Sequence, residues 1–578
     1  MQLLARRREP AHSDPAITLP PQVGPEKARR WARFGQALAV ICCLAWWPAI
    51  NADQPPAGYA ELEALFDEFI EWDRPAGAVM NIDYGPDTVR QRAAALTDFQ
   101  DRLFGLDPSG WSRGQQADYL AVRARLDQAD FHLNRARPWS RDPGFYVDPL
   151  LRLAFTELPV DAEARDGLLE QLDAIDDWLA QARTNLDEAA ADYADLAIHN
   201  LSRSDSVGHG HPFREVPPAG VIGWYEDLLD RAGDLQPELV ESISRALEAI
   251  RGFKGWLTRA RPQMTAEAGI GREAFDWYLR QVKLMPYTSD EVIVLAEREL
   301  QRTRAFYALE RHRNREIPEL ELPASAAEYH RSIAEVDADI RRFLEDEEFI
   351  TVPDYIPEDF REMGFNVPWI ERPGGPNYWE QIQYRDPAPD HWHAVIPGHR
   401  FDGRVAARNE HPIRRHIRDS GRIEGWALYL EEVPLQLGFY EERPRTRELI
   451  YNFALFRAVR TIGDVKLQRN EMTAAEAVAF WMEHTPWLDE DVARVDAEIY
   501  LRRPPGYGLG YTIGAFQLLG LLADRQRQLG EEFDLKEFHD RIMAAGRIPV
   551  ALLRFEMTGL DDQVSAFWNH VPLAELAE

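Results

Sequence analysis

Cysteine is almost missing from this chain. Of 578 residues only Cys42 and Cys43 are cysteines, and both lie in one short apolar run near the N-terminus. If that run is removed on export, the remaining protein has no thiol and cannot form a disulfide. Its stability must then come from packing, for which 45% apolar residues provide ample material.

Positive charge is scarce as well. The chain has 97 acidic residues against 66 basic ones, a formal net charge of −31, and only five of the basic residues are lysines. A strongly acidic surface repels phosphate backbones, so we expect no nucleic-acid partner.

The apolar run near the N-terminus is too short to cross a membrane. It extends over eleven residues, from Ala37 to Trp47, after a flank that contains Lys27 and several arginines. As a helix it would be roughly 16 Å long, about half the thickness of a bilayer core. We therefore predict a signal peptide within residues 1–52 and export to the periplasm or the medium, without stable membrane insertion after cleavage. The alternative is an uncleaved signal that anchors the protein to the membrane.

No alternation of strands with helices and no internal repeat is found, whereas helical patterns dominate. Thr288 and Glu291 form the sequence pattern of a capping box at a helix start. Apolar residues recur every three or four positions between 168 and 186. Further amphipathic segments cover about 58–72, 88–105, 112–137, 236–260, 290–312, 325–346, 445–470 and 510–530. We predict a predominantly all-α fold, one large domain over 53–578 with two lobes around a deep groove.

The region 347–390 is the exception, because proline and glycine accumulate there. Within it, residues 377–384 alternate loosely between aromatic or apolar and polar side chains. This pattern predicts a strand in a small β element. A second long loop is expected at 199–218.

A zinc-peptidase-like motif starts at His393 and continues to His399, with Glu424 following in a later segment. Two histidines and a carboxylate from a later helix are the ligand set of the helical zinc peptidases. His399 lies six positions after His393, so the two can meet only if Pro397-Gly398 redirects the chain. His391 with His393 is an alternative pair of ligands.

The surrounding residues resemble the bacterial domain-of-unknown-function family 885 (DUF885). The matching positions, firm from about 390 to 560, include Pro397, Gly398, His399, Glu424 to Tyr429, Glu431, Arg457, Ala458, Arg460, Asp464, Pro505, Gly506, Tyr511 and Gly514. The resemblance implies kinship with the helical zinc peptidases and a motif-bearing half at about 347–578. It further implies that His393, His399 and Glu424 are metal ligands and that Tyr511 stabilises an oxyanion; a plain core tyrosine is the alternative.

The departures from the family pattern fall on polar site positions. The general-base glutamate is replaced by Ala394, a histidine by Arg400 and another expected histidine by Gln468, while the glutamine after Pro505-Gly506 is Tyr507. Arg400 is a permanent cation and would disfavour a nearby metal. Alternatively, it forms a salt bridge with Glu424 in place of the metal. Zinc is therefore possible but doubtful, and we expect weak binding or none.

Arg457 and Arg460 lie one turn apart on a predicted helix. They could hold a peptide carboxylate, or they could belong to an internal ladder of salt bridges. We expect His393, His399, Arg400, Glu424, Arg457 and Tyr511 to surround one cavity.

Two functions fit these observations. The first is an exported, catalytically impaired relative of metallopeptidases that binds a peptide or protein partner in the inherited groove. The alternative is an active zinc-dependent peptidase or hydrolase with atypical site residues. Losing the general base alone would lower the rate by about 10²–10⁴, and this favours the first.

Overall fold

The computed structural model describes residues 58–576, except 75–78, 204–211, 213, 215 and 373. The predicted signal peptide and half of the loop expected at 199–218 therefore lie outside the described residues, and residues 199–202 belong to a helix instead. Within the described part every regular element is a helix, and only one isolated bridge, between Ala190 and Ala266, pairs extended backbone. The predicted all-α fold class is confirmed.

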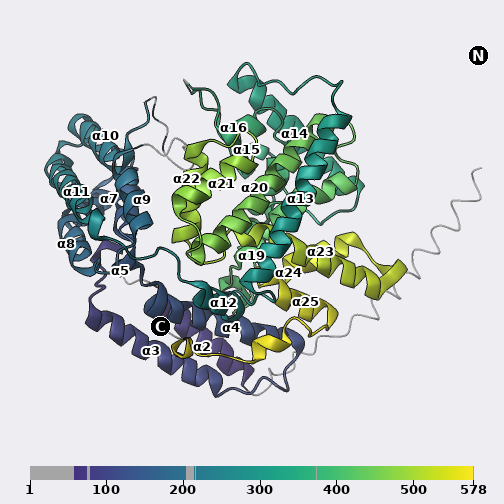
Figure 1. Cartoon of the computed structure of the whole chain (residues 1–578), viewed down its shortest axis with the longest axis horizontal. Helices are drawn as coiled ribbons and strands as arrows, with labels where there is room; N and C mark the ends of the chain where they lie inside the picture. Colours follow the sequence, from purple (N-terminus) through teal and green to yellow (C-terminus); the bar gives the residue numbers. More distant parts are fainter. Residues whose placement is uncertain are drawn as a thin grey trace, which may run out of the picture. The chain divides into compact units, whose positions relative to one another are not determined.

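The N-terminal half of the chain folds into helices of 4 to 21 residues (Figure 1). In chain order they are α2 (Tyr59–Asp73), α3 (Pro86–Phe104), α4 (Arg113–Phe131), α5 (Pro138–Arg141), α6 (Gly144–Ala154), α7 (Ala162–Asp173), α8 (Ile175–Asn185), α9 (Ala191–Ser202), α10 (Gly220–Leu235) and α11 (Val240–Ala260). Helix α11 contacts each of α7 to α10, and α10 also contacts α9 and α6.

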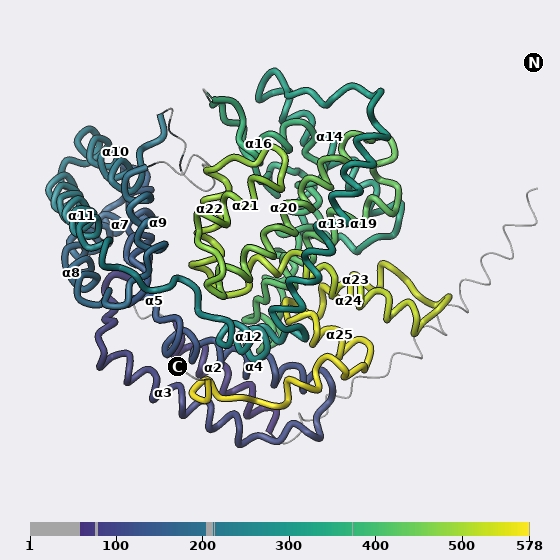
Figure 2. The backbone as a smooth tube through the Cα atoms, viewed as in Figure 1, coloured from purple at the N-terminus to yellow at the C-terminus, as the bar shows by residue number. Residues whose placement is uncertain are grey.

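The C-terminal half carries the longest helices, α13 and α20, which lie side by side (Figure 2). Its helices are α12 (Arg272–Gln281), α13 (Ser289–Arg313), α14 (Ala326–Asp346), α15 (Phe360–Met363), α16 (Tyr378–Gln383), α17 (Ala388–Ala394), α18 (His399–Ala406), α19 (Ser420–Gln436), α20 (Pro444–Gln468), α21 (Ala474–His484), α22 (Glu490–Arg502), α23 (Leu509–Leu529), α24 (Leu535–Ala544) and α25 (Val550–Thr558). Among the residues that the structure describes, no helix combines the length and the apolar character needed to cross a bilayer.

Caps and apolar faces in the sequence located most of the helices, with one predicted segment divided in two. The capping box before α13 is confirmed: the Thr288 hydroxyl accepts from the Glu291 amide, and the Glu291 carboxylate accepts from the Thr288 amide at 2.8 Å. The periodic segment 168–186 keeps its buried face but is divided into α7 and α8, which meet at Ala174.

The predicted β element is wrong. Residues Tyr378–Gln383 form helix α16, and the described part of 347–390 contains no strand. The reason is a capping box that the loose alternation concealed. The Asn377 side chain accepts from the Glu380 amide at 3.0 Å, and the Glu380 carboxylate accepts from the Asn377 amide at 2.9 Å. These two bonds satisfy free amides at the helix start and favour the helix.

Helices α19 and α23 approach closely because glycines line their contact. A Cβ atom added to Gly514 of α23 would lie 2.1 Å from the carbonyl oxygen of Gly421 in α19. One added to Gly425 would lie 2.4 Å from the carbonyl carbon of Gly514. No side chain fits between the two backbones, so the helices contact each other directly at this point.

We expect Gly514→Ala to lower the free energy of unfolding by about 1–3 kcal/mol, because the methyl group must force two helix backbones apart. Gly520→Ala is the matched control on the same helix, since a Cβ there meets no atom within 4 Å. It should leave stability unchanged or raise it by up to about 1 kcal/mol through helix propensity. Denaturant unfolding followed by circular dichroism measures both; equal stabilities would contradict the close contact.

Candidate metal centre

A sharp reversal of the chain brings His399 back to His393. Helix α17 ends at Ala394, and α18 begins at His399. Between them, a Cβ atom on Gly398 would lie only 1.9 Å from the carbonyl oxygen of His393, so only glycine can occupy this position. The Pro397 carbonyl accepts from the indole of Trp426 at 3.0 Å, which fixes the turn against α19. The sequence expectation that Pro397-Gly398 redirects the chain is confirmed.

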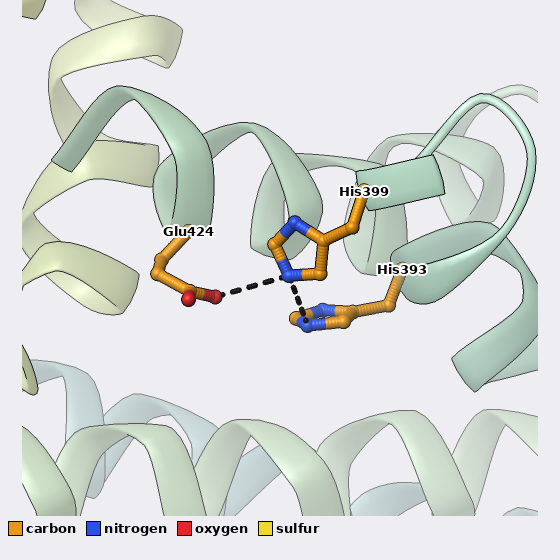
Figure 3. A group of neighbouring side chains, drawn as sticks. All are labelled: His393, His399 and Glu424. Carbon is orange, nitrogen blue, oxygen red and sulfur yellow. Dashed lines mark hydrogen bonds and ion pairs between the residues drawn. The ribbon is translucent and has the colours of Figure 1, made fainter. Parts of the chain in front are cut away.

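His393, His399 and Glu424 converge from three helices (Figure 3). The two histidine Nε2 atoms are 3.2 Å apart, and the Nε2 of His399 is 3.1 Å from Oε2 of Glu424. All three ligand atoms lie within 4.8 Å of one another, and no other such group is found in the described part of the chain. The predicted ligand set is therefore assembled at one point.

These separations fit a divalent metal ion. Zinc bonds of about 2.0–2.1 Å in tetrahedral geometry place neighbouring ligand atoms about 3.3 Å apart. Both measured contacts of His399 agree with this spacing. Two imidazoles and one carboxylate also leave a fourth position open, as in catalytic zinc sites. The residues present fit the ion that the motif implies.

The ligands have outer partners that fix their orientation. The Nδ1 atom of His393 lies 2.7 Å from Oε1 of Glu431, which also accepts from Arg457 at 3.2 Å. The Tyr507 hydroxyl donates to Oε1 of Glu424 at 2.5 Å and leaves Oε2 facing His399. A carboxylate behind a ligating histidine fixes its tautomer and raises its basicity, a common feature of metal sites.

Electrostatics prepare two ligands for binding. Burial, together with the nearby Arg457 charge, holds the pKa of His393 well below its usual value, so its imidazole is neutral. Burial alone would raise the pKa of Glu424, but His399 outweighs it and the pKa is lowered, so the carboxylate is ionised. For His399 the directions are reversed. Burial would lower its pKa, but the Glu424 carboxylate outweighs burial and the pKa is raised. A metal ion would therefore displace a proton from His399.

Most of the chain matches one known protein family. The family model for bacterial proteins of unknown function, DUF885, matches residues 81–352 and 391–557. The chain belongs to this family. No curated protein matches the DUF885 chain.

Solved structures share the fold of this DUF885 protein. One, described as "a putative lipoprotein of unknown function from Shewanella oneidensis", has a TM-score of 0.64 and 17% identity. The match covers 87% of this chain and 100% of the chain in that structure. A similarly described protein from Colwellia psychrerythraea has a TM-score of 0.62 and 16% identity, over 89% of this chain and all of its own. At such identities the likeness establishes the fold alone.

Arg400 does not lie at the metal centre, so its expected place in the cavity is wrong. Its side chain is exposed, and its guanidinium donates to the Phe365 carbonyl at 3.1 Å. The salt bridge with Glu424 is not formed either, because Glu424 contacts His399 and Tyr507 instead. Since α18 begins at His399, the next residue is rotated by about 100° around the helix and points outward.

Two other positions that differ from the expected family pattern, Ala394 and Gln468, are buried in the structure. Ala394 is buried among apolar residues and carries no group that could accept a proton. Gln468 is also buried, and its amide donates to the Tyr500 carbonyl near the end of α22 at 2.7 Å. His391 contacts Asp337 at 2.8 Å and does not belong to the metal-ligating group.

The structure gives both arginines of α20 internal carboxylate partners. Arg457 pairs with Glu431, and Arg460 pairs with Asp496 at 3.0 Å. Both guanidinium groups also face the ring of Tyr511, with Cζ 4.7 and 4.9 Å from its centre. This arrangement agrees with the internal salt-bridge ladder that the sequence left as an alternative to substrate binding.

Tyr511 lies against the centre, with its ring nearly parallel to that of His393 at 6.3 Å between centroids. Burial raises its pKa to about 12, so the phenol keeps its proton and can donate a hydrogen bond. Its expected role at an oxyanion remains a prediction.

Sequence reasoning missed the roles of Glu431 and Tyr507. Glu431 follows Glu424 by seven residues on one helix, a spacing that shares a face and could have revealed it. Tyr507 lies outside any helix, and no periodicity points from it to Glu424.

We expect Glu431→Gln to weaken zinc binding by about 10- to 100-fold, because the amide no longer polarises His393. Glu432→Gln, one residue later on α19, removes a carboxylate that pairs with Arg302 instead and should leave affinity unchanged. Competition against a chromophoric chelator gives both affinities. Equal losses in the two variants would show that Glu431 has no specific role at the metal.

Proposed function

We propose that this DUF885 protein is an exported, zinc-dependent peptide-binding protein, related to the helical zinc peptidases, that hydrolyses peptide bonds poorly or not at all. One observation carries the proposal. The three ligands converge with metal-like spacing, while the position of the general base is occupied by Ala394.

The ligand side of a peptidase site is complete. His393, His399 and Glu424 would hold zinc, and Glu431 would orient His393. Bound zinc supplies Lewis-acid polarisation of a peptide carbonyl. The Tyr511 hydroxyl is protonated and lies beside His393, where it can donate to the same carbonyl oxygen.

Proton transfer is the part that is lacking. In the peptidases a glutamate beside the first histidine takes the proton of the attacking water. Ala394 has no proton acceptor, and Glu431 is already engaged by His393 and Arg457. Glu424 is needed as a ligand. Binding without efficient turnover is the outcome that these side chains favour.

Export is supported by two observations. The basic flank and short apolar run before residue 53 have the form of a signal peptide. The two solved structures that share the fold are described as lipoproteins, a class of exported proteins.

The second candidate is an active zinc peptidase that uses another proton acceptor. The complete ligand set and the position of Tyr511 favour it. Wild-type activity separates the two candidates.

We expect Ala394→Glu to hydrolyse peptides about 10²–10⁴ times faster than wild type in a chelator-sensitive manner, because it restores a general base. Ala394→Gln is the matched control, with the same bulk in the buried position and no basic group. Both variants and wild type should contain one zinc per chain by elemental analysis. Arg400 needs no reversion because it points away from the site.

A library of fluorogenic peptides measures the rates. Wild-type hydrolysis as fast as that of Ala394→Glu would favour the active peptidase. Wild type purified in zinc-containing buffer without bound metal would overturn the metal centre itself.

A further inference from the structure

A large cavity lies beside the metal centre and is not part of it. Its volume is about 1460 Å³, and its walls come from α4, α6, α9, α22 and the segment that follows α22. None of the three candidate ligands lines it. Typical small-molecule pockets measure about 300–1,000 Å³. This cavity therefore has room for a longer ligand.

The cavity is positively charged in a strongly acidic protein. Nine arginines line it and only five acidic residues, an excess of four positive charges, whereas the whole chain carries −31. The arginines are Arg92, Arg125, Arg141, Arg152, Arg203, Arg214, Arg372, Arg502 and Arg503. A concave surface of one sign raises the local concentration of ligands of the opposite sign. Arg214 and Arg372 pair with carboxylates outside this lining, so the charge that a ligand meets comes from the arginines without such a partner.

Three of these arginines are free to bind a ligand. Within the described part of the chain, Arg152, Arg203 and Arg503 make no side-chain hydrogen bond or ion pair, and all three are exposed. Arg502, by contrast, is held by Asp142 and other carboxylates.

The free arginines lie near Arg502, which links α22 to α6 through an ion pair. Arg502 pairs with Asp148 of α6 at 2.8 Å, and Arg152 lies one helical turn after Asp148. Arg503 follows Arg502 directly as the C-terminal cap of α22.

Arg203 reaches the same junction from α9. It is the C-terminal cap of that helix, and Asn200, one turn earlier, donates to Glu498 of α22 at 2.7 Å. Glu498 in turn pairs with Arg502. Three unpaired guanidinium groups from three helix ends therefore face one cavity around a shared contact.

Arg503 also connects the cavity to the metal centre. Its guanidinium carbon lies 4.6 Å from the centre of the Tyr507 ring, and the Tyr507 hydroxyl donates to the ligand Glu424. A ligand held at Arg503 would be separated from the metal ligands by one aromatic side chain.

We propose that this cavity binds an acidic peptide, whose carboxylates pair with Arg152, Arg203 and Arg503 and whose chain continues toward Tyr507 and the metal centre. The choice of a peptide rests on the proposed function. Aromatic and proline side chains such as Trp72, Trp369 and Pro505 form much of the wall and suit apolar side chains between the acidic ones. The volume exceeds that needed for a single amino acid.

The test uses a fluorescein-labelled octapeptide of alternating glutamate and phenylalanine, compared with the same peptide containing glutamine. Fluorescence anisotropy with the full mature chain should give about tenfold tighter binding of the acidic peptide, the gain of one good charge-assisted pair. Arg503→Ala should reduce that affinity about fivefold, and the triple alanine variant should abolish the preference for glutamate.

Arg298→Ala is the control, because Arg298 is exposed on α13, makes no side-chain hydrogen bond or ion pair with the described residues and does not line the cavity. It should bind like wild type. These surface substitutions change stability little, so loss of folding does not confuse the result. Equal affinities for the two peptides, or an unchanged affinity in Arg503→Ala, would overturn the proposal.

Two further arms separate the alternatives. We measure binding in chelator and again with zinc. The dependence on Arg152, Arg203 and Arg503 should persist in both, since none of the three contacts His393, His399 or Glu424. Failure of zinc binding would thus count against the proposed function alone. Trigalacturonate, an acidic saccharide, competes with the labelled peptide in the second arm. If it displaces that peptide at a lower concentration than the unlabelled peptide does, the ligand is an acidic saccharide and the peptide assignment is overturned.

Discussion

The direct backbone contact between α19 and α23 is the constraint on which the candidate site depends. Glu424 lies on α19 between Gly421 and Gly425, the two glycines that meet Gly514 of α23. Tyr511 lies one turn before Gly514 on the other helix. Any side chain at the crossing would separate the helices and move Glu424 away from Tyr511, which faces His393. Small residues here set the distance between Glu424 and Tyr511 as well as the packing of the two helices.

Buried charge is the second constraint, and the fold offsets the two buried arginines of α20 with carboxylates. Helix α20 is buried along nearly its whole length yet carries Arg457, Arg460 and Asp464. A buried ion without a partner costs several kcal/mol. Arg457 is offset by Glu431, which also orients His393, so one ion pair connects the core helix to the metal centre. The stability of the core and the geometry of the site rest on the same carboxylate.

The sequence predicted the helices well and the side-chain directions poorly. Amphipathic periodicity and the Thr288 cap located helices such as α13 and α20 because burial of one face determines them. The strand expected at 377–384 failed because a local cap outweighs a weak alternation. Arg400 was misplaced because its direction depends on where the turn after His393 ends, which spacing alone does not reveal. Tyr507 and the arginine-lined cavity could not be predicted, since both arise from segments far apart in the chain.

Position 394 belongs to the apolar core. Ala394 is 4% exposed and packs in the main cluster of buried apolar residues. His393 and His399, the Glu431 carboxylate beside His393 and the turn at Gly398 are arranged as in a candidate metal site. Each buried polar group lowers the stability of the fold unless it is paired. A protein without any use for the site would be expected to lose these groups. Glu431 contacts both His393 and Arg457, and Tyr507 holds Glu424, so the contacts that offset these buried charges also keep the candidate ligands together.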